Sequence, residues 1–445
     1  MLGYGSMVNC EEYPTTLPGV LVENGYRTVV VGKNHFGESK SNKGNREYIT
    51  HGYEELQLYE GIRAIYDDYD AFFNTSFPGV DPLLSTCGLD FNSWMACPYA
   101  HDEYYHPTSW TTRQAIDYLN EWKGNQEPTL LKISYHRPHS PYDPPQRLWD
   151  KHMALKHEDA YARIIDNTQW DAEWLNFTEM NSDAFFGDPG EDAARKARAA
   201  YYANVEYVDE GIGSILTALE NEDEVLRDDV FIIWTTDHGD MNGDHNLWRK
   251  GYPWEGSSHV NMLMRTMGQT EGRISDAIVE TRDVTPTIFD IVGTLDNIKS
   301  RDPLVNGMSL LPILEGGVDS VRDMLDLEHS VVYDKRLHWN AIVGFKEGKL
   351  YKYIFFVPNG KEYLFCLTDD PNESNDLAGA VSDKTEALVG FWRNAMVDQF
   401  EREGRGDEWV LNGKLASGRR GITFGPNYAC PHEDASFIRE SIAVE

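Results

Sequence analysis

The sequence predicts an α/β protein in which a mostly parallel central sheet is flanked by helices, with a small antiparallel sheet near the C-terminus. Over the first three-quarters of the chain, short apolar β-rich runs alternate with helical patterns, which favours a parallel sheet covered on both faces. From about Ser330 the pattern changes to short strands separated by turns such as Pro-Asn-Gly, typical of an antiparallel sheet. We therefore expect an α/β domain over residues 1–320 and an α+β subdomain with an extended tail over residues 321–445.

The first strand is expected over residues 27–31, which are apolar and β-branched, after a short helix that begins near Leu17. Asn24-Gly25 supplies the stop signal between them. The strand delivers Lys33 and His35 between two glycines, so both side chains can face one pocket. Taken alone, these two residues fit an ordinary loop equally well.

A second strand is expected over residues 129–135, after an amphipathic helix over residues 108–123. It leads into a turn stiffened by prolines that flank His139. His139 is therefore well placed as a proton donor or an anion ligand, with a packed loop histidine as the alternative. Residues 38–107 and 143–190 show little periodicity and are expected to be surface excursions that shape specificity.

The densest group of reactive side chains follows the run DVFIIWTT at residues 229–236, which predicts a buried strand. The strand delivers Asp237, His238 and Gly239 to the sheet edge at which α/β proteins bind ligands. The following residues add more polar groups and turn glycines: Asp240, Gly243, Asp244, His245, Arg249, Lys250 and Gly251. This combination indicates a metal-plus-anion site, and a polar surface loop is the alternative.

Two helices are expected on either side of this strand in the sequence. The pattern over residues 191–221 has one apolar face, made by Ala200, Val205, Val208, Ile212, Ile215 and Leu219. Residues 275–293 predict a second helix with Val284, Ile288 and Ile291 turned inward. Beyond them, strands are expected in SVVYD, NAIVGFKE, KLYKYIFF and KEYLFCL, followed by a helix at about 383–402.

The net charge restricts the class of partner. The chain has 40 Lys and Arg residues against 73 Asp and Glu residues, a formal charge of −33. This argues against nucleic acid or an anionic membrane surface as the main partner. An anionic ligand would need a local cluster of positive groups or a metal ion.

Cysteines and targeting signals say little about location. The five cysteines are scattered without CxxC or zinc spacing, and an odd count excludes complete intramolecular pairing. A Cys87–Cys97 bridge is one option. No run of 18 apolar residues exists, and the first residues do not resemble a signal peptide. Three glycosylation sequons favour a secreted, lysosome-like or periplasmic location only weakly, so localisation and oligomeric state stay unassigned.

The motifs at these strand ends, taken in order, resemble those of the type I sulfatase family of the alkaline-phosphatase superfamily. ENGYRTVVVGKNHFG resembles the family's second signature, and YHRPHSPY its Pro-His-x-Pro turn. TTDHGDMNGDHNLWRKG resembles its Asp-His-Gly metal loop and the lysine that follows. The resemblance covers nearly all of residues 15–400 and implies an alkaline-phosphatase-like sandwich.

The resemblance also implies a role for each residue. Asp237 and His238 would coordinate a divalent cation, usually calcium in this family. Lys33 and Lys250 would hold the sulfate oxygens. His35 would assist the nucleophile, and His139 would bind the sulfate or protonate the leaving alcohol. The implied substrate is a sulfate ester of a carbohydrate or small molecule.

Two parts of the family pattern are missing from this sequence. Family members begin with a strand that ends in paired aspartates, followed by Cys-x-Pro-x-Arg or a Ser variant, whose first residue becomes formylglycine, the nucleophile. None of the five cysteines fits that motif. In addition, His259 stands where the family tends to have the arginine of Arg-Val-Pro. We expect a truncated sulfatase sequence, inactive as it stands, rather than a true pseudo-sulfatase. The competing functions are a phosphonate or phosphate ester hydrolase and a non-catalytic protein that binds sulfated ligands.

Overall fold

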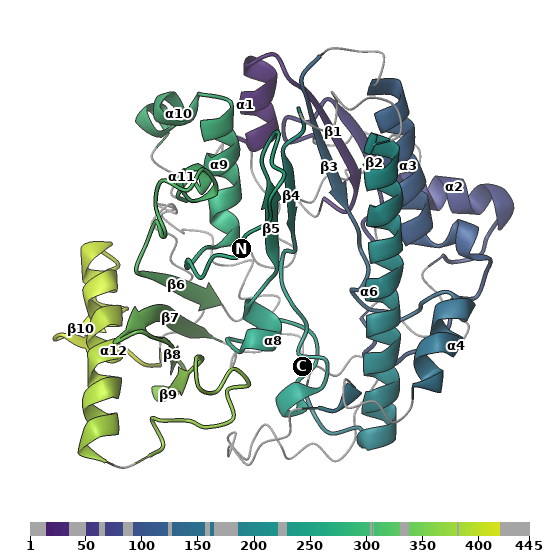
Figure 1. Ribbon diagram of the computed structural model, residues 1–445. Helices are drawn as coiled ribbons and strands as arrows, with labels where there is room; N and C mark the ends of the chain where they lie inside the picture. The colour runs from purple at the N-terminus through teal and green to yellow at the C-terminus, as the bar shows by residue number, and fades with distance from the viewer. Residues whose placement is uncertain are drawn as a thin grey trace.

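The computed structural model describes residues 15–34, 50–61, 67–82, 92–122, 127–155, 161–163, 186–220, 229–302, 305, 307–329, 338–380 and 382–418. They form a large α/β part and a smaller part built on an antiparallel sheet (Figure 1). The elements of the larger part are α1 (Leu17–Glu23), β1 (Arg27–Gly32), β2 (Glu55–Leu58), α2 (Asp68–Ser76), η1 (Glu103–Tyr105), α3 (Pro107–Trp122), β3 (Thr129–Ser134), α4 (Gln146–Ala154), α6 (Glu191–Glu220), β4 (Ile232–Thr235), η3 (Asp244–Asn246), α8 (Glu255–Ser258), β5 (Met262–Arg265), η4 (Thr281–Asp283), α9 (Val284–Ile291), α10 (Leu295–Arg301) and α11 (Leu311–Leu314). Those of the smaller part are β6 (Met324–His329), β7 (Trp339–Lys346), β8 (Lys349–Phe356), β9 (Lys361–Cys366), α12 (Asp383–Arg402), β10 (Val410–Leu411) and β11 (Lys414–Leu415).

The central sheet consists of two hydrogen-bonded pieces. In the first, β1 lies between β2 and β3 and pairs with both in parallel, which confirms the predicted parallel sheet. In the second, β4 pairs with β5 in antiparallel orientation. Figure 1 shows β4 between β5 and β3. The sheet order therefore brings β3 and β4 next to each other, although they belong to different ladders.

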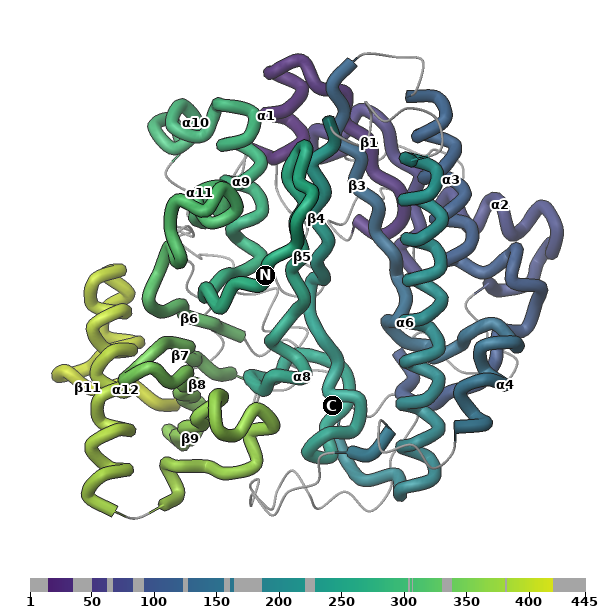
Figure 2. Tube along the Cα trace, viewed as in Figure 1, coloured from purple at the N-terminus to yellow at the C-terminus, as the bar shows by residue number. Residues whose placement is uncertain are grey.

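Helices flank these strands as predicted. α3 contacts β1 and β3 and packs against α6, whereas α1 contacts β1. Figure 2 shows α9 on one side of the β3 and β4 strands and α6 on the other. No helix among the described residues is long and apolar enough to cross a membrane.

Most of the predicted elements are present, and several others were not predicted. α1, β1, α3, β3, α6 and α12 lie where they were predicted. The segment 38–107, predicted to be a surface excursion, in fact contributes β2 to the sheet, and it also contains α2. The prediction missed β2 because its four residues alternate Glu, Leu, Gln and Leu, too short a run for a reliable pattern. α4 in the segment 143–190 was missed as well.

Two predicted elements are shorter than expected, and two strands were not foreseen. The strand of residues 229–236 is reduced to β4, and the helix of residues 275–293 to α9, which follows a 3-10 turn. β5 and β6 were not predicted. The predicted strand SVVYD lies outside the described residues, as do residues 419–445 of the predicted tail.

The antiparallel sheet in order β6-β7-β8-β9 supports the loop that follows β4. On one face, Ile354 and Phe356 of β8 share a core cluster with Trp254, which begins α8. On the other face, Trp392 and Met396 of α12 form a second cluster with the sheet. The predicted domain boundary near residue 320 stays a prediction.

Candidate active site

Five of the six predicted site residues lie together where three strands end. Lys33 follows β1, and its Nζ lies 3.4 Å from Oδ2 of Asp237, which follows β4. Lys250 Nζ lies 2.9 Å from Nε2 of His139, which follows β3. The rings of His139 and His238 are 6.3 Å apart. The sixth residue, His35, lies outside the described residues.

The contacts of Asp237 and His238 fix their orientation. The backbone N–H of His238 donates to Oδ1 of Asp237 at 3.0 Å. His238 Nδ1 lies 2.8 Å from the carbonyl oxygen of Gly239, which can only accept, so Nδ1 carries the proton. Nε2 is then left with a lone pair, 3.4 Å from Asp237 Oδ2. A carboxylate oxygen and an imidazole nitrogen therefore face the same space.

Electrostatics keep Asp237 charged and His238 neutral. Burial opposes ionisation of Asp237, but electrostatic interactions with His238 and with the Lys33 and Lys250 charges outweigh it and lower the pKa of this carboxyl. Burial lowers the pKa of His238 to about 4, and the Lys250 charge adds to this effect against the opposing Asp237. The Asp237 side chain is 54% exposed because it borders an open cavity. Both groups can thus serve as cation ligands.

His139 acts as an acceptor in this arrangement. Its Nδ1 lies 2.8 Å from the carbonyl oxygen of Ser140, so Nδ1 is the protonated nitrogen and Nε2 accepts from Lys250. Burial, followed by the charges of Lys250, His136 and Lys33, holds the pKa of His139 well below its usual range. Burial, followed by the Lys33 charge, lowers the pKa of Lys250 to about 7, so the exchangeable proton of the pair lies on Lys250 and can be released near neutral pH.

The loop between β4 and Lys250 is held by Asp240. Its Oδ1 accepts the backbone N–H groups of Asn242 at 2.8 Å and Arg249 at 2.9 Å, and Oδ2 accepts the Tyr142 hydroxyl at 2.9 Å. Arg249 adopts a left-handed conformation with φ 65°. Asp240 therefore supports the turn that presents Lys250.

The sequence analysis grouped more polar residues of this loop into the site than the structure places there. Asp244 accepts from Arg198 of α6 at 2.9 Å, and His245 is 4% exposed. Gly243 and Gly251 occupy positive φ, as the prediction of tight turns requires. Gly239 is needed for a different reason, since an added Cβ would lie 2.2 Å from the carbonyl oxygen of Gly256. Asp240, Asp244 and His245 thus shape the loop.

A buried ion pair that the sequence analysis did not single out supports the turn that carries His139. Arg137 donates from Nε to Asp143 Oδ1 at 2.6 Å, and a second bond to Oδ2 measures 2.9 Å. Both residues are almost fully buried. The sequence could have suggested this pair, because Arg137 and Asp143 carry opposite charges and flank His139 in the HRPHSPYD segment.

The described residues supply only part of a cation site. Calcium takes six to eight oxygen ligands. Asp237 and His238 offer one carboxylate and one imidazole, and the described part of the chain contains no cluster of three or more His, Cys, Asp or Glu residues suited to a metal. These two donors fit one side of a divalent cation, and the remaining ligands would have to be backbone carbonyls, waters or side chains outside the described residues.

The fold of this chain matches that of solved structures with low sequence identity. A solved phosphonate monoester hydrolase from Silicibacter pomeroyi superimposes with a TM-score of 0.65 at 18% identity, covering 89% of this chain and 81% of that one. The solved BT4656, in complex with D-glucosamine-2-N,6-O-disulfate, superimposes with a TM-score of 0.61 at 18% identity over 90% and 84% of the two chains.

Sequence comparison identifies the family. The sulfatase family model matches residues 3–294. An arylsulfatase of Clostridium perfringens is 31% identical, over 91% of this chain and 82% of that protein. A choline-sulfatase of Rhizobium meliloti is 27% identical, over 92% and 78%. The chain therefore belongs to the sulfatase family, as its motifs had indicated.

Proposed function

We propose that this site binds the sulfate group of a small-molecule or carbohydrate sulfate ester for hydrolysis. The observation that carries the proposal is that Lys33 contacts Asp237 while Lys250, in the loop after β4, contacts His139, so that the two lysines lie close enough to interact with each other and with Asp237. In a chain with a net charge of −33, such a local pair of ammonium groups offers an anion a favourable place. The relatives named arylsulfatase and choline-sulfatase support the same substrate class.

The chain's own residues would have two roles, to stabilise negative charge on the sulfate and to donate a proton to the leaving alcohol. Lys33 and Lys250 would contact the non-bridging sulfate oxygens, where negative charge must be held during the reaction. The Lys250–His139 pair places a proton beside that position, available to the departing alcohol. His35, by resemblance, would assist the nucleophile.

A divalent cation, Ca²⁺ by resemblance, would be held by Asp237 and His238 together with backbone carbonyls, waters or side chains outside the described residues. When bound, the cation would add positive charge next to the sulfate and orient the nucleophile. The formylglycine motif is absent from the 445 residues. We therefore propose that these 445 residues alone hydrolyse sulfate esters negligibly.

Binding and turnover of 4-nitrophenyl sulfate by the purified chain test the proposal. We expect saturable binding by calorimetry without turnover. Lys33→Ala and Lys250→Ala should each weaken binding at least about tenfold, because a hydrogen bond to a charged group contributes roughly 1.5–3 kcal/mol. Lys349→Ala is the matched control, since Lys349 pairs with Asp369 on the surface of the smaller part.

Two results would contradict the proposal. If 4-nitrophenyl sulfate still binds equally well after Lys33→Ala and after Lys250→Ala, these lysines do not form the proposed anion site. Turnover that is abolished by Lys250→Ala would instead show that this chain carries its own nucleophile. 4-Nitrophenyl phosphate, tested in parallel, distinguishes a sulfatase from a phosphate ester hydrolase.

A further inference from the structure

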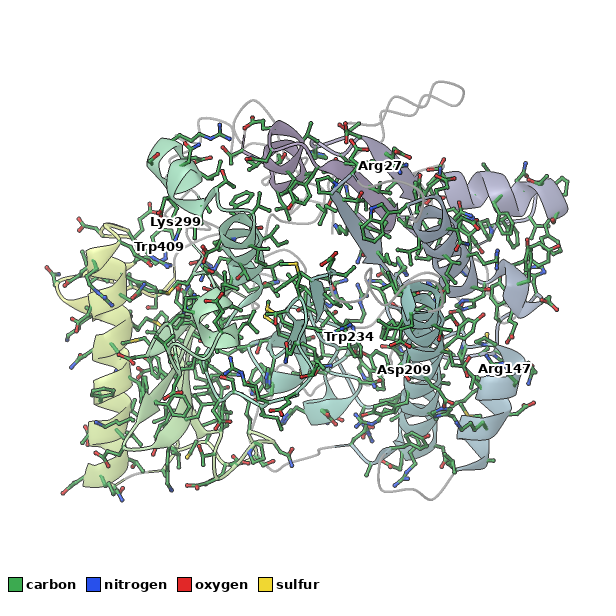
Figure 3. All side chains as sticks on the ribbon, turned by 45° about the horizontal axis from the view of Figure 1, so that its top comes forward. Arg27, Arg147, Asp209, Trp234, Lys299 and Trp409 are labelled. Carbon is green, nitrogen blue, oxygen red and sulfur yellow. The ribbon has the colours of Figure 1, made fainter. Side chains whose placement is uncertain are left out.

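The candidate active site shares its cavity with one face of α6. Lys33 and Lys250 line this cavity, which has a volume of about 2,080 Å³, and so do Tyr201 and Asp209 of the helix. Figure 3 labels Asp209 near Trp234 of β4, another residue of the cavity wall. α6 therefore borders the space in which the two lysines would hold a sulfate group.

Tyr201 lies beside the loop that carries the proposed anion site. Its ring meets that of Tyr142 edge-on, with centroids 5.6 Å apart and an interplanar angle of 88°. The Tyr142 hydroxyl donates to Asp240, which supports the turn that presents Lys250. The charges of Asp240 and Asp237 both act on the Tyr201 hydroxyl. Tyr201 is thus close to the strand end that supplies Asp237.

The hydroxyl of Tyr201 differs from those of its neighbours in having no protein partner. Tyrosine hydroxyls in protein interiors usually make a hydrogen bond. The Tyr142 hydroxyl donates to Asp240, and that of Tyr207, on the same helix as Tyr201, donates to the carbonyl oxygen of Glu103 at 3.2 Å. Within the described part of the chain, no group pairs with the Tyr201 hydroxyl. It is therefore available to a molecule in the cavity.

The electrostatic surroundings keep this hydroxyl a donor. Burial, followed by the interactions with Asp240, Tyr202 and Asp237, raises the pKa of Tyr201 above that of a free tyrosine. The phenol therefore keeps its proton throughout the neutral pH range, and a protonated phenol can donate one hydrogen bond. Such a bond is strongest when its acceptor is charged.

The helix holds this donor in a fixed position. α6 has 30 residues and packs against α3 and α4, and Tyr201 is further held by its ring contact with Tyr142. Lys33 and Lys250, in contrast, lie in the segments that follow β1 and β4. A donor on a rigid element positions a ligand more closely than a donor at the end of a flexible side chain.

We propose that Tyr201 is a sulfate-binding residue, whose hydroxyl donates a hydrogen bond to a non-bridging oxygen of the ester sulfate. The inference rests on the proposed function, because it assigns the sulfate to the space beside Lys33 and Lys250. The lysines supply positive charge, and Tyr201 adds a third donor that carries no charge and comes from the opposite wall of the cavity.

Tyr201→Phe tests the assignment, because it removes the hydroxyl and retains the ring that packs on Tyr142. Binding of 4-nitrophenyl sulfate and of inorganic sulfate to the full chain is measured by calorimetry. We expect the Kd of both ligands to rise about tenfold, as for the loss of a hydrogen bond to a charged group. The Tm should stay close to that of wild type, since no hydrogen bond within the described part of the protein is lost.

Tyr202→Phe is the matched control. Tyr202 is the next residue of α6 and also lines the cavity, with 38% of its surface exposed. Its ring packs against Tyr161, at a centroid distance of 5.8 Å. Removal of its hydroxyl should leave the Kd of both ligands unchanged, although a phenol is lost from the same cavity.

The outcomes separate this inference from the proposed function. If Lys33→Ala and Lys250→Ala weaken binding but Tyr201→Phe does not, the inference is wrong and the proposed function stands. A loss for 4-nitrophenyl sulfate without a loss for inorganic sulfate would also overturn it, because the hydroxyl would then contact the alcohol part of the ester. Equal losses in Tyr201→Phe and Tyr202→Phe would overturn it as a general effect on the cavity. Failure of the wild-type chain to bind either ligand would contradict the proposed function and this inference together.

Discussion

At the scale of single residues, Asp240 shows how a side chain can control the site without entering it. Its carboxylate accepts three hydrogen bonds, two from the loop backbone and one from Tyr142. These bonds hold Arg249 in its left-handed conformation and so place Lys250 against His139. The proposed binding of sulfate by Lys250 should therefore depend on a carboxylate that does not itself contact Lys250 or His139 through a hydrogen bond.

Graded substitutions test this dependence. Tyr142→Phe removes one of the three bonds and should cost about 1 kcal/mol of stability. Asp240→Ala leaves two buried backbone donors and the Tyr142 hydroxyl unsatisfied, so it should cost at least about 3 kcal/mol and weaken 4-nitrophenyl sulfate binding. Urea unfolding and calorimetry measure the two effects. Equal losses for both variants would show that Asp240 does not hold the loop through its backbone bonds.

At the scale of elements, a buried charge cluster joins α8 to the antiparallel sheet. Lys352 of β8 is fully buried and contacts Glu255 of α8 and Glu373, the latter at 3.0 Å. The Lys352 ammonium also donates to the carbonyl oxygen of Pro253 at 2.9 Å. Glu255 reaches in turn to His259, at 2.7 Å. Because Gly239 bonds to Ser257 in α8, this cluster anchors the floor of the active site to the smaller part of the molecule.

The cluster should give the protein an acid-sensitive stability. Burial alone would raise the pKa of Glu255, but the charges of Lys352 and His259 outweigh it and lower the pKa to about 2 from 4.5. A pKa depressed by folding means that the stabilisation is complete above about pH 4.5 and is lost as the pH falls towards 2. The Glu255→Gln variant should therefore lose about 3 kcal/mol less unfolding free energy than wild type as the pH falls over this range.

Thermal unfolding of wild type and Glu255→Gln across this pH range measures the difference. Asp369→Asn is the control, because Asp369 pairs with Lys349 at the surface, where solvent screens the interaction. If wild type and Glu255→Gln lose the same stability as the pH falls, the Lys352 cluster is not the source of the acid sensitivity.

At the scale of the whole molecule, the elements that sequence patterns predicted are those with many residues or strong signals. α6 and α12 are long amphipathic helices, and β1 and β3 are apolar runs with clear ends. β2 and β5 have four residues each, and their pairing is decided by neighbours distant in the sequence. Local pattern cannot supply that information.

The site was predictable at the strand ends and not between them. Lys33, His139 and Asp237 follow recognisable strands, and the parallel order brings such ends together. The assignment of Asp240 to loop support depends on contacts with Tyr142 and Arg249 that arise only on folding. The placement of the β4-β5 ladder beside β3 likewise depends on the sheet order, which spacing along the chain does not reveal.

The overall charge gives a last prediction. With a formal charge of −33, long-range repulsion among carboxylates opposes the compact state, and the local ion pairs can offset it only in part. Salt screens repulsion over distances beyond about 10 Å at 0.1 M, whereas close buried pairs such as Arg137–Asp143 are screened much less. The Tm should therefore rise when sodium chloride is increased from about 10 mM to about 150 mM. Potassium chloride should act equally, and sucrose of matched osmolality should have a smaller effect. A Tm that falls with salt would mean that exposed ion pairs outweigh the net repulsion.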